Sequence, residues 1–240
     1  MKCDKLPTFR KFGKLLKYDF LESFYSILLI NGILLALMAA QRFVFNGDSN
    51  PLVAVLFVVV MPVGYLLSLV FLTMTIIKLL YNRIFTADGY LTFALPVSLD
   101  AILISKILVS GAYVVVSSIV IGVWAFVISG VVHFGAISQL FEFNRIAWFL
   151  NGIVGIFSMS ALVLLILSIL HIGAITRFRT LCGITLFMLF MIIESLCYGM
   201  ILGELESHQI LPIMGLGFNA LKGILYYFVA RYLIANKLEI

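Results

Sequence analysis

Six long, predominantly apolar stretches recur along this chain, separated by short polar clusters. An α-helix needs about 20 apolar residues to cross roughly 30 Å of hydrocarbon, and it satisfies all of its own backbone hydrogen bonds there. The sequence therefore predicts an all-α membrane protein with six transmembrane helices. The predicted spans cover residues 23–41, 51–77, 101–132, 146–170, 180–202 and 213–235, which places the six-span domain in residues 23–240.

Composition supports this class and excludes others. Hydrophobic residues make up 63% of the chain and charged residues 11%, whereas water-soluble domains carry about 25% charged residues. Soluble, disordered and nucleic-acid-binding classes are therefore excluded, and the expected surroundings are membrane lipids. The three cysteines are too few for a secreted disulfide framework.

Basic residues indicate the orientation of the spans. With the N-terminus in the cytoplasm, all but three of the 16 lysines and arginines fall on the cytoplasmic side. The exceptions are Arg42 and Arg145 on the outer side and Lys222 within the sixth span. By the positive-inside rule, both termini are expected in the cytoplasm.

The segment before the first span has two faces. On a helix that begins near Thr8, apolar residues recur three or four positions apart, namely Phe9, Phe12, Leu16 and Phe20. The cations Arg10, Lys14 and Lys17 gather on the opposite side. Residues 1–22 are therefore expected to form an interfacial amphipathic helix on the cytoplasmic leaflet. The alternative is a basic tail that only sets orientation.

No motif for covalent chemistry or metal binding is visible. The three histidines, His133, His171 and His208, have no metal-ligand spacing, and no serine elbow occurs. The chain also lacks a P-loop, so ATP-driven work would need ATP and Mg²⁺ on a separate polypeptide. We expect no catalytic residue, no metal site and no cofactor on this chain.

The cytoplasmic connection of residues 81–100 is unusually apolar for a loop in water. Its large side chains are Ile84, Phe85, Tyr90, Leu91, Phe93 and Leu95. Such a segment is expected to lie against the membrane, against the chain's own spans, or against a partner. Ser98 stands where it can cap the third span, and the charge of Asp100 suits a helix N-terminus.

The residues from Arg83 to Ser98 read Arg-Ile-Phe-Thr-Ala-Asp-Gly-Tyr-Leu-Thr-Phe-Ala-Leu-Pro-Val-Ser, and Ile-Leu-Ile-Ser-Lys follows at 102–106. This pattern resembles the loop after the second span of bacterial type 2 ABC transporter permeases. The ending Tyr-Leu-Ile-Ala-Asn-Lys-Leu-Glu-Ile at 232–240 is similar to their basic tails. One departure is Asp88, where the family has Glu before the Gly-Tyr pair.

The resemblance implies a permease subunit of an exporter in a bacterial plasma membrane. It implies a coupling helix within residues 84–95 that docks on an ATP-binding subunit, through Ile84, Phe85, Asp88, Gly89, Tyr90, Leu91, Phe93 and Leu95. It also implies two copies of that subunit and a second permease chain, identical or not. The cargo would be an amphipathic peptide, a peptide antibiotic or another hydrophobic substrate.

Two charged residues fall inside predicted spans, Glu194 in the fifth and Lys222 in the sixth. Each is expected roughly 12 to 14 Å below the outer surface, on consecutive antiparallel helices. A charge at such depth costs on the order of 3 kcal/mol, so the two are candidates for an ion pair or for a polar translocation path. The alternative is that Lys222 reaches outward and Glu194 is protonated or lies near water.

The sequence leaves two other functions open. A non-energised membrane binding protein, such as an immunity factor or a vitamin-binding component, would work without an ATPase and tolerate changes at Gly89 and Tyr90. An intramembrane enzyme would need several polar residues at one depth, which only Glu194 and Lys222 approach.

Overall fold

A computed structural model describes residues 8–46, 51–85, 98–128, 143–173, 178–202 and 211–237. These ranges form helices α1 (Thr8–Asn46), α2 (Pro51–Phe85), α4 (Leu99–Ile128), α6 (Phe143–Ile172), α7 (Arg179–Leu202) and α8 (Leu211–Lys237). The described part of the chain is thus all-helical, as the apolar stretches predicted.

Five of the six helices contain a stretch long and apolar enough to cross a membrane. These stretches are Phe12–Ala40, Leu99–Gly122, Ile146–Ile172, Thr180–Met200 and Ile213–Asn236. In the described part of α2, the apolar stretch is shorter and covers Val70–Tyr81. Five helices of the described chain thus have the length and composition of membrane spans, as a membrane protein requires. The second predicted span, residues 51–77, stays a prediction.

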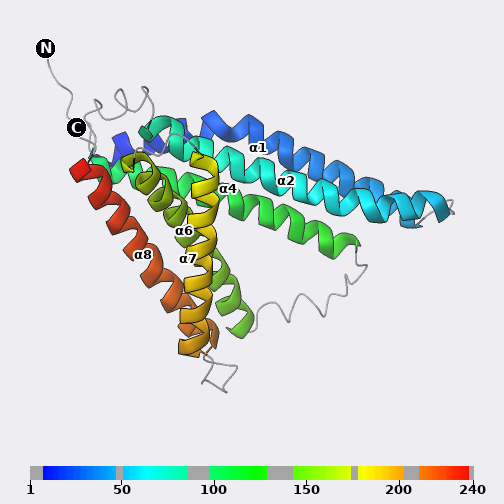
Figure 1. Cartoon of the computed structure of the whole chain (residues 1–240). Helices are drawn as coiled ribbons and strands as arrows, with labels where there is room; N and C mark the ends of the chain where they lie inside the picture. The colour runs from blue at the N-terminus through cyan, green and yellow to red at the C-terminus, as the bar shows by residue number, and fades with distance from the viewer. Residues whose placement is uncertain are drawn as a thin grey trace, which may run out of the picture.

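The helices form two arms (Figure 1). The first arm is α1, α2 and α4, and the second is α6, α7 and α8; α6 packs against α4 and α2 and so joins the arms. The arms meet where α1 begins and α8 ends, and from there they diverge (Figure 1). We call the meeting point the closed end. If the termini are cytoplasmic as predicted, it faces the cytoplasm.

The main hydrophobic core lies at the closed end. It joins the end of α2 and the start of α4 to the last turns of α6 and α8, with Leu80, Leu103, Leu164 and Ile234 all fully buried. At the helix ends, water surrounds the protein, so burial of apolar side chains against one another is stabilising there. This burial holds the two arms together at the closed end. Farther along, much of the apolar surface is exposed and suits contact with lipid.

The first helix differs from the sequence-based expectation. α1 continues through residue 22 without a break, so no helix boundary separates the predicted interfacial segment from the first predicted span. Its buried stripe passes through Leu15, Asp19, Ser23 and Ile27, while Phe20, on the face predicted to meet lipid, is 36% exposed. This happens because the stripe packs on α4. The interfacial placement of residues 8–22 stays a prediction.

The start of α4 agrees with the expected cap. The backbone N–H of Ala101 donates to Ser98 Oγ at 3.4 Å, and Asp100 lies in the first turn of the helix. A serine at this position satisfies one of the otherwise unpaired N–H groups of a helix start. The Asp100 carboxylate also reaches the second arm, where it accepts a hydrogen bond from Tyr227 of α8.

Candidate functional site

Glu194 is an unusual residue for its helix. Among the α7 residues whose side chains are described, it is the one buried residue, while its neighbours Ile193 and Leu196 are 47% and 59% exposed. A helix in lipid normally turns apolar side chains outward and polar ones toward protein. Here the side chain that α7 buries is a carboxylate, so its polar contacts help to set how this helix is rotated, together with apolar packing on the Leu162 cluster of α6.

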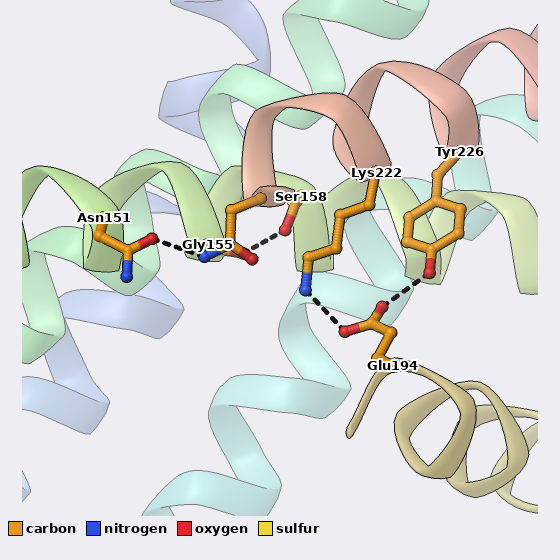
Figure 2. Close-up of polar contacts among 7 residues, drawn as sticks. Asn151, Gly155, Ser158, Glu194, Lys222 and Tyr226 are labelled. Atoms are coloured by element: carbon orange, nitrogen blue, oxygen red, sulfur yellow. Dashed lines mark hydrogen bonds and ion pairs between the residues drawn. The ribbon is translucent and has the colours of Figure 1, made fainter. Parts of the chain in front are cut away.

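Two side chains of α8 hold that carboxylate (Figure 2). Lys222 Nζ donates to Glu194 Oε2 at 2.6 Å, and Tyr226 Oη donates to Glu194 Oε1 at 2.7 Å. Lys222 and Tyr226 are four residues apart and so lie on the same face of α8. Each carboxylate oxygen therefore has its own partner. The structure brings together the two intramembrane charges that the sequence singled out.

The pair is well shielded. The side chains of Lys222 and Glu194 are 11% and 10% exposed. The ammonium also lies 5.7 Å from the centre of the Phe218 ring, one turn earlier on α8, and an aromatic face attracts a cation. Hydrogen bonding and the ring offset part of the cost of removing two charges from water.

A second polar contact continues toward the start of α8. Asn219 Nδ2 donates to Asn151 Oδ1 of α6 at 2.7 Å. The same Asn151 has its Nδ2 2.9 Å from where a Cβ on Gly215 would stand, and a Cβ on Gly223 would lie 3.1 Å from Ser158 Cβ. Glycines at these two positions let α8 approach α6 closely. Asn151 and Ser158 lie two turns apart on the face of α6 that meets α8, next to the Glu194–Lys222 pair (Figure 2).

The sequence did not point to the most deeply buried charge pair. Lys106 Nζ donates to Asp19 Oδ1 at 2.6 Å, and Ser105 donates to the other oxygen of Asp19. All three residues are fully buried. Lys106 lies within the predicted span 101–132, and a charge inside a span could have marked it as a candidate for an ion pair. The positive-inside rule instead assigned it to the cytoplasmic side with the other basic residues. The pair fastens α1 to α4, and the Tyr113 hydroxyl adds a bond to the Phe20 carbonyl.

A third cluster joins the two arms. Asp100, in the first turn of α4, accepts a hydrogen bond from Tyr227 Oη at 2.7 Å and forms an ion pair with Arg231, both on α8. The side chains of Arg231 and Asp100 are 45% and 42% exposed. Exposed ion pairs are worth about 0 to 1 kcal/mol. The cluster therefore fixes the position of α4 relative to α8 more than it stabilises the fold.

The predicted ATPase-docking residues divide into two groups. Ile84 and Phe85 end α2 and are 2% and 7% exposed, within the main core. Phe85 also stacks on Tyr81 and lies 4.9 Å from the His171 ring. The side chains of Ile84 and Phe85 therefore face the chain's own core and offer no docking surface. The other six, Asp88, Gly89, Tyr90, Leu91, Phe93 and Leu95, lie outside the described residues.

No group of three or more His, Cys, Asp or Glu residues that could hold a metal ion occurs within the described ranges. No protein-family model matches the chain, and no curated protein or solved structure matches it. Support for a function therefore comes from the contacts above and from the resemblance of the 81–100 segment.

Proposed function

We propose that this chain is the transmembrane permease subunit of an ATP-driven exporter in a bacterial plasma membrane. It would move an amphipathic peptide or another hydrophobic substrate outward. ATP and Mg²⁺ would be bound by two copies of a separate ATP-binding subunit, and a second permease chain would complete the transporter. In this proposal the chain itself carries out no covalent chemistry.

The observation that carries the proposal is how the start of α4 is connected. Asp100 is the last residue of the predicted coupling loop 81–100, and its carboxylate is bonded to α8. Less than two turns later, Ser105 and Lys106 are bonded to Asp19 of α1. A displacement of the segment would therefore be passed to both arms, through groups that are already bonded.

The end of α2 supports the same idea. Ile84 and Phe85 anchor the beginning of the segment in the main core, and Asp100 anchors its end. A loop whose two ends are packed against other helices passes a displacement on to those helices. A loop whose ends make no such contacts would move without displacing them. This is the mechanical property that an ATPase-driven permease needs.

The test is purification of the tagged chain from its native cells in mild detergent, with mass spectrometry of what co-purifies. The Tyr90→Asp variant places a charge in the proposed docking segment. The matched control is Phe141→Asp, which makes a similar change in the connection between the third and fourth predicted spans, on the predicted outer side. The expected result is a P-loop ATPase in stoichiometric amount with the wild type and with Phe141→Asp, and its loss with Tyr90→Asp.

Recovery of the wild-type chain alone, stable and functional, would overturn the proposal and favour a non-energised binding or immunity protein. Equal loss of the ATPase in both variants would also count against docking at Tyr90, because a general disturbance of folding would then explain it.

A further inference from the structure

A groove runs between the arms, with α4 and α8 as its walls and α6 as its floor. Its volume is about 550 Å³, which is within the range of roughly 300 to 1,000 Å³ for small-molecule sites. Its apolar lining includes Ile104 and Leu108 of α4, Val154 and Ala161 of α6, and Ile224 and Phe228 of α8. The groove is therefore shaped and lined for an apolar ligand.

The polar side chains of the groove are already engaged. Ser158 donates to the Gly155 carbonyl at 2.8 Å, and Asn219 donates to Asn151. Tyr227 donates to Asp100. Binding an alkyl chain here would leave these hydrogen bonds intact, whereas a polar ligand would have to replace them. The occupant should be a hydrocarbon chain.

The groove has a charged mouth at the closed end. Tyr227 lines it there, and its partner Asp100 holds Arg231 one turn farther along α8. A second hollow of about 520 Å³ continues past Phe228 along α8 and is lined by Arg231 and Asn236. The two hollows share Phe228, so a half-exposed guanidinium and an amide lie next to the end of the apolar groove.

Arg231 retains donors for an anion. A guanidinium carries five N–H groups, and the contacts to Asp100 involve its Nε and Nη2 atoms. Arginine recognises phosphate well because its donors form a planar fork. Asp100 orients the guanidinium and offsets part of its charge, so a bound anion competes with the Asp100 carboxylate.

We propose that the groove binds one acyl chain of an anionic phospholipid from the cytoplasmic leaflet, with the lipid phosphate at Arg231. Charge complementarity supports this occupant, since the closed end presents the Arg231 cation next to the end of the apolar groove. The predicted cytoplasmic side also carries most of the chain's basic residues, which attract anionic lipids. The proposal does not depend on an ATPase partner.

The experiment is native mass spectrometry of the full-length chain, titrated with phosphatidylglycerol or with phosphatidylcholine of identical acyl chains. Arg231→Gln and Asp100→Asn break the same ion pair, but weaker binding is expected only for Arg231→Gln. Loss of one cation near a charged surface should weaken phosphatidylglycerol binding about fivefold. Asp100→Asn frees the guanidinium, so binding should be equal or tighter.

A second pair of variants tests the groove itself. Ala220 lines the groove, so Ala220→Phe should abolish binding of the acyl chain. Leu221 is the next residue, 62% exposed and outside the groove, so Leu221→Phe should leave binding unchanged. If Ala220→Phe does not purify as a folded protein, Ile104→Phe narrows the groove from the opposite wall.

Several results would overturn the proposal. Equal binding of the two lipids, which both carry a phosphate but differ in net headgroup charge, would remove the preference for an anionic lipid. A similar loss with Arg231→Gln and Asp100→Asn would assign the ion pair to folding alone. Unchanged phosphatidylglycerol binding in Ala220→Phe would place the lipid elsewhere. A lipid-free dimer that Ala220→Phe disrupts would make the groove an interface between two copies of the chain.

Discussion

Replacement of Lys222 by Met is the most direct test of how α7 is held in the bundle. The change keeps most of the side-chain volume but removes the ammonium that donates to Glu194 at 2.6 Å. The carboxylate then stays buried, with the Tyr226 hydroxyl as its remaining hydrogen-bond donor. Because the side chain of Glu194 is 10% exposed, water cannot replace the lost contact without movement of α7.

The expected loss of stability follows from that geometry. Removing one partner of a buried ion pair costs about 3 to 5 kcal/mol. Tyr226 still donates to the carboxylate, so the lower value applies, about 3 kcal/mol or roughly 100-fold in the unfolding equilibrium. The free energy of unfolding would be measured by titrating the purified chain from mild detergent into SDS. Leu225→Met, at a position 54% exposed, is the matched control and should have little effect.

A double-mutant cycle separates the pair from general damage. Combining Glu194→Gln with Lys222→Met removes both charges, so most of the loss should be recovered. If the two single losses simply add, the two residues are not energetically coupled, and the account of α7 given above is refuted.

The movement of α7 can also be observed separately. Cys182 is partly buried and packs against the Leu162 cluster of α6. In a background without Cys3 and Cys197, Lys222→Met should speed the reaction of Cys182 with a membrane-permeant thiol reagent, since a released α7 exposes it. An unchanged rate would mean that α7 keeps its position without the ion pair.

Further predictions concern the first arm and its contact with α6. Asp19→Asn leaves the ammonium of Lys106 fully buried and should cost about 3 to 5 kcal/mol in the same SDS titration, with recovery in a double variant that also carries Lys106→Met. Gly111→Ala places a Cβ against the Phe157 ring and should cost about 1 to 3 kcal/mol by overpacking. The control is Gly122→Ala, at a position where nothing lies within 4 Å of an added Cβ, and it should be neutral or stabilising by up to about 1 kcal/mol. Equal effects of Gly111→Ala and Gly122→Ala would refute the close contact of α4 with α6.

Periodicity and length predicted the helices well but not every helix face. The start of α4 at Ser98 and Asp100 followed from local capping chemistry, which acts within a few residues. The N-terminal segment was different. Its aromatic residues indicated a face toward lipid, but nothing in the spacing indicated that another stripe of α1, with Leu15 and Asp19, is buried against α4. A face is set by what packs on it, and sequence spacing alone does not contain that information.

The site residues show the same contrast. Glu194 and Lys222 stood out because a charge inside an apolar span is costly wherever the helix packs. Tyr226 did not stand out, because a tyrosine is common in membrane helices. Its role appears only when its hydroxyl is seen on Glu194. Ile84 and Phe85 were expected on a docking surface, but the last turn of α2 turns them into the core.

The apolar stretches by themselves determined that this chain is a helical membrane protein, because an uncharged stretch of that length has no comparably stable place in water. The tertiary structure decided which polar groups meet. Asp19 and Lys106 are 87 residues apart, and Asp100 reaches a tyrosine 127 residues away. Hydropathy constrains each helix separately, whereas such pairs depend on the rotation and crossing of helices relative to one another. That arrangement also creates the groove between α4 and α8, which no single stretch of sequence encodes.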